Sequence, residues 1–263
     1  MLLIKLTNFE TINIVSRKLF CGGDMDRKLV TIVIPVYNEE GILEEAVKRL
    51  KNDLVPFEQD FTFELILAEN GSKDNTIAKG QKLAEADPFV SIFHYQYPDY
   101  GLALQEGIRR AKGEIVICDE IDLCLPEFYE KALDLFKNSG VEMIVGSKRV
   151  EGANDQRPFK RRFATWILNI MLKVILGFKG TDTHGVKAFL KKPLMPVLDK
   201  CIVGKDIFAS EFVIRAERMG INIKEVPISL DEKRAPSIKL MKRVPKVLSN
   251  LAYLFWNIRV KNR

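Results

Sequence analysis

The chain has 263 residues, of which 47% are hydrophobic and 29% are charged, and this composition excludes an intrinsically disordered protein and suits one large α/β domain. The net charge of +6 and the pI near 9.0 favour an anionic partner, such as a phosphate ester, an anionic lipid or a nucleic acid, without choosing among them. The four cysteines form no CxxC pair, and neither histidine lies at ligand spacing from a cysteine pair, so we expect reduced thiols in a cytoplasmic protein and no zinc site.

Predicted strands and helices alternate through the first half of the chain. The β-branched apolar run that ends at Pro35 predicts a buried parallel strand, and apolar residues with helical spacing follow Asn38. The alternation continues, which predicts strands at 29–35, 63–68, 90–94, 114–118 and 141–147, and helices that open near residues 38, 74, 101 and 126. This order predicts an α/β fold with a Rossmann-like, mostly parallel central sheet flanked by helices.

Polar clusters follow four of these predicted strands. They are Tyr37-Asn38-Glu39, Glu69-Asn70, Asp119 to Asp122, and Lys148-Arg149. Because ligands bind at the carboxyl ends of the strands in such sheets, this coincidence predicts a functional site at that edge.

The second half of the chain contains two apolar segments. The only polar residues between 163 and 178 are Thr165, Asn169 and Lys173, which are four apart and form one narrow stripe on a helix. This helix reaches only ~24 Å, short of a ~30 Å hydrocarbon core, so we expect it in a membrane interface or in a protein core.

A helix is also predicted at 206–220 and a short strand at 223–228. The C-terminal segment places apolar residues on one face and carries basic residues beside them: Val244, Val247, Leu248, Leu251, Phe255 and Ile258, with Lys239, Lys242, Arg243 and Lys246. Such a helix could rest on anionic lipid, and the alternative for both segments is packing in the protein's own core or in a dimer interface. We therefore expect an N-terminal extension at 1–28, one domain at 29–240 and a C-terminal amphipathic basic helix at 241–263.

Several motifs, in this order, resemble those of family 2 glycosyltransferases of the GT-A fold. They are Ile32-Val-Ile-Pro-Val-Tyr-Asn-Glu39, Glu69-Asn-Gly-Ser-Lys-Asp-Asn-Thr76, Glu120-Ile-Asp-Leu123 and Asp182-Thr-His-Gly-Val-Lys-Ala-Phe189. The later Ser210-Glu-Phe, Glu225-Val-Pro-Ile228 and Arg234-x-x-Ser237 are similar to the dolichyl-phosphate mannose synthase branch. The resemblance covers about 29–240. It implies inverting transfer of a sugar from a GDP- or UDP-linked donor to a polyprenyl or dolichyl phosphate.

For the donor, the resemblance places Pro35, Tyr37, Glu39 and Glu69 around the nucleoside. A carboxylate can accept hydrogen bonds from a base or a ribose hydroxyl. Asn70 stands where the family has a second carboxylate, so it joins the predicted donor site as a residue that can change donor preference. The alternative for Asn70 is that it forms a turn with the glycine that follows.

Glu120 and Asp122 are the candidate ligands of Mg²⁺ or Mn²⁺, which would neutralise the departing diphosphate. Their i, i+2 spacing puts both on one side of an extended segment, with Asp119 pointing the other way. We count Asp122 as catalytic and Glu120 as a further contact to the donor. The family has Asp at the position of Glu120. The alternative is that these acids cap the helix that starts near Pro126.

For the acceptor, the resemblance places Arg149 and Arg162 near the lipid phosphate, which a planar guanidinium can bind at two oxygens. The alternative is a solvated basic face that includes Lys148. Asp182 and Glu211 match family positions near the sugar and the acceptor, and we expect catalytic roles for both. Asp182 could equally cap a helix, and Glu211 could pair with Arg215. His184 is expected to be a satisfied polar residue, and His94 is given no role.

Three other functions stay open at this point. Transfer to a glycan or soluble hydroxyl needs a general base, for which Asp182 or Glu211 would serve. A non-catalytic nucleotide-sugar-binding protein is motivated by the departures at Glu69-Asn70 and Glu120. Nucleic-acid binding is the weakest, because the basic residues cluster without interleaved exposed aromatics. The expected partners are thus a nucleotide sugar, a lipid phosphate and a membrane surface that the protein binds peripherally, and no nucleic acid.

Overall fold

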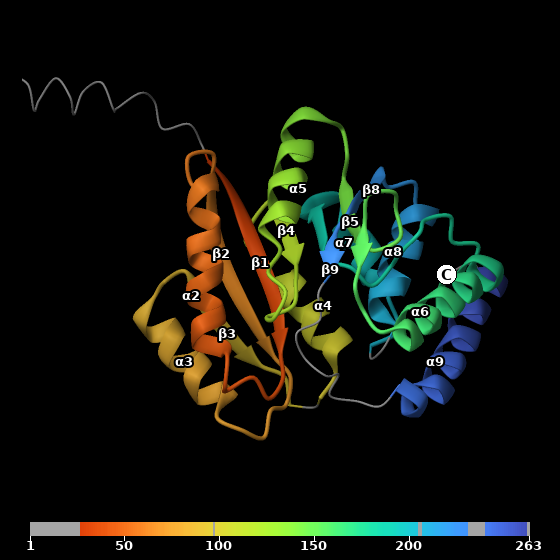
Figure 1. Ribbon diagram of the computed structural model, residues 1–263, viewed down its shortest axis with the longest axis horizontal. Coiled ribbons are helices and arrows are strands. Elements are labelled where there is room, and N and C mark those ends of the chain that lie inside the picture. The colour runs from red at the N-terminus through yellow and green to blue at the C-terminus, as the bar shows by residue number, and fades with distance from the viewer. Residues whose placement is uncertain (1–26, 97, 205–206, 231–239, 262–263) are drawn as a thin grey trace, which may run out of the picture.

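The structure is a computed structural model that describes residues 27–96, 98–204, 207–230 and 240–261 (Figure 1). Most of the predicted N-terminal extension, 1–26, lies outside the described residues, as do Arg234 and Ser237 of the last motif and Lys239 of the basic segment.

A seven-stranded sheet forms the centre of the molecule, in the order β3-β2-β1-β4-β7-β5-β8. Its strands are β1 (Lys28–Val36), β2 (Phe61–Glu69), β3 (Val90–His94), β4 (Ile115–Cys118), β5 (Met143–Ser147), β7 (Lys187–Leu190) and β8 (Ile223–Pro227). All neighbours pair in parallel except β7, which runs antiparallel to both β4 and β5. Two short strands, β6 (Asn154–Asp155) and β9 (Ser229–Leu230), pair beside it. The mostly parallel sheet is confirmed.

Helices cover both faces of the sheet (Figure 1). The described helices are α2 (Leu43–Leu54), α3 (Thr76–Ala86), α4 (Tyr100–Arg110), α5 (Pro126–Asn138), α6 (Phe159–Met171), α7 (Lys191–Asp199), α8 (Phe208–Arg218) and α9 (Leu240–Phe255), with a short 3₁₀ turn at Val55–Phe57 and π-helical turns at Leu172–Leu176 and Trp256–Val260. Ile32 of β1 packs into the core under α2 and α5, whereas Val33 packs into the core under α4, α7 and α8. Burial on both faces explains the continuous apolar run of this strand.

Two elements differ from the sequence prediction. The first helix begins at Leu43 and not near Asn38, because 38–40 is hydrogen-bonded to the segment after β2. Strand β7 was not predicted, since it has only four residues and starts with a lysine. Its approach to β5 requires Gly185, where a Cβ atom would lie 1.7 Å from the carbonyl oxygen of Gly146.

The two apolar segments of the second half form α6 and α9. Each of these helices packs against the rest of the molecule with one face and exposes the other. In the predicted polar stripe of α6, Asn169 is buried. Most of the large hydrophobic side chains of this helix point outward instead.

In α9, Leu251 and Leu254 enter the core, and so does Ile258 in the π-helical turn that follows, while Leu248 and Phe255 are exposed. The prediction that Leu248, Leu251 and Phe255 share one face is therefore wrong. The side chain of Val244 is not described. Among the described residues, no helix combines the length and the hydropathy that crossing a bilayer requires.

Candidate active site

The polar clusters predicted from the sequence come together at one edge of the sheet. Strands β1, β2, β4 and β5 all end there, because they run parallel. The antiparallel strand β7 starts at the same edge, so the turn that carries Asp182 joins the group. The edge therefore collects side chains from five segments that are far apart in the sequence.

The loops after β1 and β2 are fastened to each other by hydrogen bonds. The backbone N–H of Asn38 donates to Ser72 Oγ (2.9 Å), and the N–H of Lys73 donates to Asn38 Oδ1 (2.8 Å). The N–H of Glu39 donates to Thr76 Oγ1 (2.8 Å). Asn38 has a φ of 55°, a left-handed conformation that asparagine tolerates better than most residues. The ring of Tyr37 stays exposed beside this fixed loop.

Two residues that are predicted to contact the donor, Pro35 and Glu69, are buried. Pro35 lies buried within β1, one residue before its end. Glu69 has no exposed surface, and its carboxylate accepts from the N–H of Ser72 and contacts His94 Nδ1. Burial alone would raise the pKa of Glu69, but the hydrogen bonds from Ser72 and His94 outweigh it and lower that pKa. The carboxylate of Glu69 therefore already has two partners, and its predicted contact with the base stays a prediction.

Asn70 is explained by its own turn. It is buried, and both its backbone N–H and its side-chain Nδ2 donate to the carbonyl oxygen of Val36, at 3.1 and 3.2 Å. An aspartate could not make the second bond, because an ionised carboxylate only accepts. Gly71 follows with a φ of 81°. The turn interpretation is confirmed, and a donor contact of Asn70 stays a prediction.

Glu120 and Asp122 point outward at the end of β4. Both are exposed, whereas Asp119 is buried and accepts from Tyr129 Oη (2.6 Å) and from the N–H of Glu120 (2.7 Å). The predicted opposite orientation of Asp119 is thus confirmed. Helix α5 has Leu125 as its N-cap and no side-chain cap bond. The alternative in which these acids cap α5 is therefore wrong.

The three acids repel one another. Desolvation by the surrounding chain and then the charges of Asp122 and Asp119 raise the pKa of Glu120. Burial raises the pKa of Asp119 to about 6, although the Tyr129 hydroxyl opposes this. A bound cation would relieve this repulsion between like charges.

Asp182 is fully buried at the base of the site. Lys148 Nζ lies 3.0 Å from its Oδ2, and the N–H of His184 donates to its Oδ1 (3.0 Å). Burial alone would raise the pKa of Asp182, but Lys148 and this N–H together lower it to about 2. A carboxylate held so firmly in its charged form is a poor base and has no surface for a ligand. The predicted catalytic role of Asp182 stays a prediction, whereas a solvated Lys148 is wrong, because Lys148 is buried.

Glu211 on α8 is likewise buried and held in an ion pair. It is fully buried and accepts from Arg215 Nε (2.7 Å), which confirms the alternative of an ion pair with Arg215. It also accepts from the N–H groups of Ile202 (3.0 Å) and Val203 (2.8 Å). The carboxylate of Glu211 thus holds the turn before α8, and its predicted catalytic role stays a prediction.

Arg149 and Arg162 have the exposure that their predicted role requires. Within the described part of the chain, neither side chain has a hydrogen-bond or ion-pair partner. The backbone around Arg149 is nevertheless fixed, because its N–H donates to Ser147 Oγ (3.1 Å), which in turn bonds Thr181 Oγ1 (2.6 Å). Asn169 Nδ2 of α6 donates to the carbonyl oxygen of Thr181 (3.1 Å). The helix that carries Arg162 is thus tied to the same turn.

Two functional candidates escaped the sequence reasoning. Lys187 is buried on β7, where its Nζ donates to the carbonyl oxygen of Gly185 (2.6 Å), and burial lowers its pKa to about 8. The sequence reasoning missed Lys187 because strand β7, on which it lies, was not predicted. His94 ends β3 at the functional edge, and the rule of strand ends would have found it. His184 is satisfied, as expected, since its Nδ1 lies 3.0 Å from Thr183 Oγ1.

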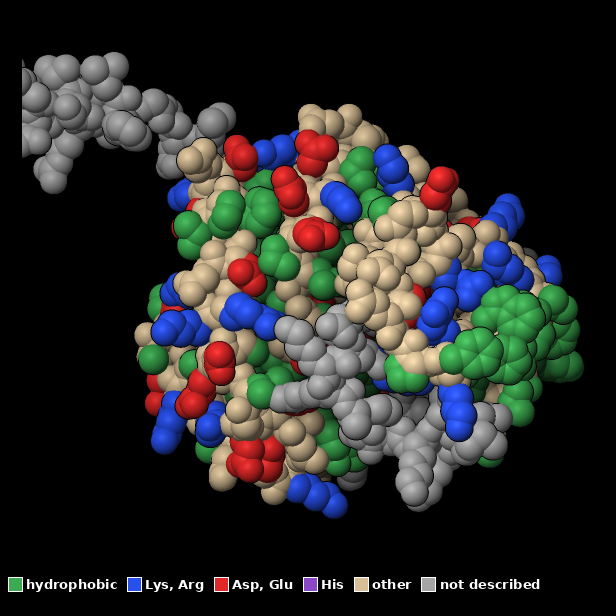
Figure 2. Space-filling view, viewed as in Figure 1, with side chains coloured by type: hydrophobic (Ala, Val, Ile, Leu, Met, Phe, Trp, Pro, Cys, Tyr) green, Lys and Arg blue, Asp and Glu red, His purple; other side chains and the backbone are tan. Residues whose placement is uncertain are grey.

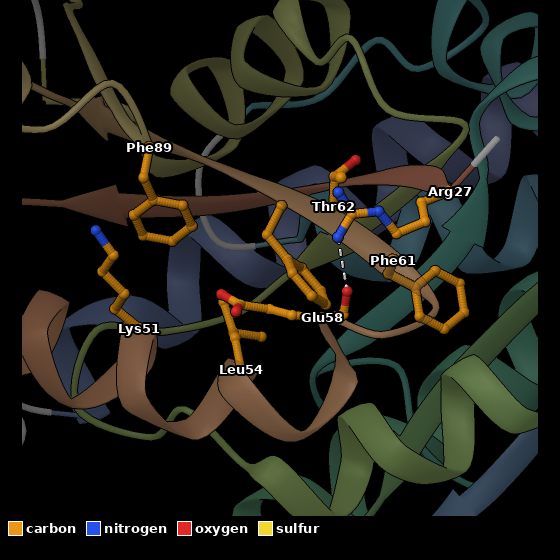
Figure 3. Close-up of a pocket in the computed structure, with 8 residues that line it drawn as sticks. Arg27, Lys51, Leu54, Glu58, Phe61, Thr62 and Phe89 are labelled. Carbon is orange, nitrogen blue, oxygen red and sulfur yellow. Dashed lines mark hydrogen bonds between the residues drawn. The ribbon is translucent and has the colours of Figure 1, made fainter. Parts of the chain in front are cut away.

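A separate surface hollow lies at the other end of β2 (Figure 3). Lys51, Phe61, Thr62 and Phe89 are among its lining residues, and Arg27 Nη1 donates to the carbonyl oxygen of Glu58 at its rim (2.8 Å). Because Phe61 starts β2 and Glu69 ends it, this hollow is remote from the functional edge.

Several known proteins are similar to this chain in sequence. The model of glycosyl transferase family 2 matches residues 31–196, more than half of the chain. The chain is 27% identical to the undecaprenyl-phosphate mannosyltransferase of Micrococcus luteus, over 80% of this chain and 87% of that one. It is 25% identical to glycosyltransferase AglD of Haloferax volcanii over 89% of this chain, and it spans only 38% of that relative.

The fold matches as well. The mannosyltransferase PcManGT of Pyrobaculum calidifontis, solved in complex with GDP-Man and Mn²⁺, superposes with a TM-score of 0.52 and 17% identity, covering 95% of this chain and 71% of that one. The predicted GT-A fold is thereby confirmed. The chain belongs to glycosyl transferase family 2, as a glycosyltransferase of the GT-A fold.

Proposed function

We propose that this chain transfers a sugar, with inversion, from a GDP- or UDP-sugar to a polyprenyl phosphate at a membrane surface, assisted by Mg²⁺ or Mn²⁺. The observation that carries the proposal is the pair of exposed carboxylates, Glu120 and Asp122, at the edge that also presents Tyr37. The Micrococcus luteus relative is named for an undecaprenyl-phosphate acceptor, and the Pyrobaculum structure holds GDP-Man and Mn²⁺.

The residues at the end of β4 fit a divalent cation. Mg²⁺ and Mn²⁺ prefer oxygen ligands, and Glu120 and Asp122 supply two carboxylates that are otherwise exposed and repel each other. The diphosphate of the donor would supply further oxygen ligands to the cation. When bound, the cation would stabilise the negative charge on the departing nucleoside diphosphate.

The protein's own residues prepare this site. The bonds from Asp119 to Tyr129 and to the N–H of Glu120 anchor the loop, so that Glu120 and Asp122 face outward. Tyr37 presents its ring on a loop that the hydrogen bonds to 72–76 hold in place, and it can stack on the nucleobase.

The acceptor must be a nucleophile that needs no general base from the protein. Asp182 and Glu211, which would have served as bases for a hydroxyl acceptor, are both buried in ion pairs. A lipid phosphate is already an anion at neutral pH and needs cations in place of a base. Arg149, in the loop after β5, and Arg162, on α6, are exposed cations that can bind phosphate oxygens. These observations favour a phosphate acceptor over a hydroxyl.

An assay of sugar transfer tests this function. Purified protein is incubated with radiolabelled GDP- and UDP-sugars, polyprenyl phosphate in detergent, and Mn²⁺ or Mg²⁺, and the label in the organic phase is counted. We expect lipid-linked label with at least one donor, and label that depends on the metal. Label that enters only a soluble glycan, or no label with any donor and metal, would refute the proposal.

The membrane contact rests on the outer face of α6. Its exposed hydrophobic side chains are Phe159 (77% exposed), Phe163, Trp166, Ile167 and Ile170, and Val174 (75% exposed) follows in the π-helical turn Leu172–Leu176. The rings of Phe159, Phe163 and Trp166 stack in sequence along the helix. Figure 2 shows hydrophobic side chains gathered on this side of the molecule next to lysine and arginine side chains. Such a face suits the boundary between acyl chains and anionic head groups.

Replacing Phe163 by Glu should therefore weaken membrane binding. A charge on this face would have to enter the apolar part of the interface, so we expect the bound fraction on anionic vesicles to fall about fivefold or more. Flotation at low salt measures it. Val55→Glu, which alters a half-exposed valine in the turn after α2, is the matched control and should bind like the native chain. Equal flotation of the Phe163 variant would contradict the assignment.

A further inference from the structure

His94 lies in the donor region although no motif marks it. It ends β3 opposite Glu69, its register partner at the end of β2, and the N–H of Tyr95 donates to the carbonyl oxygen of Glu69 (2.7 Å). The Glu69 side chain has no exposed surface, whereas the His94 side chain is 47% exposed. The imidazole therefore covers the carboxylate and stands between it and any ligand on that side.

Glu69 controls which nitrogen of His94 carries the proton. Its Oε2 contacts Nδ1, while its Oε1 is taken by the N–H of Ser72. Hydrogen bonds lower the pKa of Glu69 despite its burial, so it is an ionised acceptor. A carboxylate beside Nδ1 keeps the N–H on that nitrogen, which leaves a lone pair on Nε2 of the neutral ring.

A chain of hydrogen bonds connects His94 with the loop that carries Tyr37. Ser72 donates its N–H to Glu69 and accepts at its Oγ from the N–H of Asn38, next to Tyr37. The loop that carries Tyr37 is thus connected to the imidazole of His94 through Asn38, Ser72 and Glu69. This pairing offers a base one surface for stacking and one group for hydrogen bonding.

We propose that His94 is the residue that reads the nucleobase of the donor, through Nε2 as an acceptor, with Glu69 as its positioning residue. An acceptor at this place matches the ring N–H of uracil or guanine, beside their carbonyl groups. It disfavours cytosine and adenine, whose corresponding ring nitrogens are themselves acceptors. The inference rests on the proposed function, and it assigns to His94 the preference for uracil or guanine over cytosine or adenine.

Calorimetry with four nucleotides tests this role. UDP, CDP, GDP and ADP are titrated into the native protein in the presence of Mn²⁺. We expect either UDP to bind about tenfold or more tightly than CDP, or GDP to exceed ADP by the same factor, because a pocket built for one hydrogen bond rejects a partner that leaves it unmade. In His94→Gln, whose amide can both donate and accept, this ratio should fall below about threefold. His94→Phe should bind the preferred nucleotide about tenfold more weakly.

The controls separate base reading from a structural role. Ser91→Ala changes an exposed residue three positions earlier on β3 and should keep the native ratio. Glu69→Gln should narrow the ratio as His94→Gln does, because an amide no longer fixes the tautomer, and it carries the test if His94→Phe does not fold. Native affinity and an unchanged ratio in folded His94→Gln and Glu69→Gln would overturn the role of His94 alone. A native protein that binds none of the four nucleotides would overturn the proposed function and this inference together.

Discussion

Asp122→Asn is expected to lower kcat/KM for sugar transfer about 10³-fold, with little change in the urea midpoint. The amide keeps the shape of the side chain but removes the negative charge that holds the cation, and losses of this size are typical when charge stabilisation of a leaving group is removed. Asp122 is exposed, so its replacement leaves no buried group without a partner. Transfer of labelled sugar to polyprenyl phosphate measures the effect.

Glu127→Gln is the matched control. Glu127 is an exposed acid in the first turn of α5, five residues beyond Asp122, and its replacement should leave transfer unchanged. Glu120→Gln should resemble Asp122→Asn if both carboxylates hold the cation. Transfer that survives in both variants at the native rate would remove the end of β4 from the mechanism.

The second large effect concerns stability. Lys148→Met should destabilise the protein by about 3–5 kcal/mol, because it leaves the carboxylate of Asp182 buried without its cation. Both partners are nearly or fully buried and 3.0 Å apart. Urea unfolding measures the change. Lys79→Met breaks an exposed pair with Glu44 and should change stability by less than about 1 kcal/mol. Equal effects of the two variants would contradict the buried pair.

The stability of the protein should depend on pH through the buried pair of Lys148 and Asp182. The pKa of Asp182 falls from 3.8 to about 2 on folding, so its charged form stabilises the folded protein above pH 4. This contribution, about 2 kcal/mol, is lost as the pH falls through 2. Urea midpoints measured between pH 5 and pH 2 should show less of this acid loss in Lys148→Met than in the native chain.

Much of the fold follows from patterns that lie close together in the sequence. The apolar runs of β1 and β4 are continuous because these strands are covered on both faces, and the helices between the strands show their own period. Strand β7 could not be predicted, since four residues that begin with Lys187 carry no such pattern. Which face of α9 is buried also depends on its neighbours: Leu251 packs inward and Leu248 does not.

The site was predictable in its position and less so in its contacts. Parallel strands guarantee that Tyr37, Glu69 and Asp122 reach one edge, because their residues follow strand ends. Whether a carboxylate is free depends on partners that the sequence places elsewhere, such as Lys148 for Asp182 and His94 for Glu69. The pair of Glu211 and Arg215 was foreseen because four residues along a helix bring side chains together.

The central claim is that Glu120 and Asp122 hold a cation against a nucleoside diphosphate. Calorimetric titration of UDP and GDP into the native chain and Asp122→Asn, each with Mn²⁺ and with a chelator, tests it most directly. We predict that Mn²⁺ tightens binding of the preferred nucleotide about tenfold or more in the native chain and has little effect in the variant. Native binding that is equally tight with Mn²⁺ and with chelator would contradict the claim.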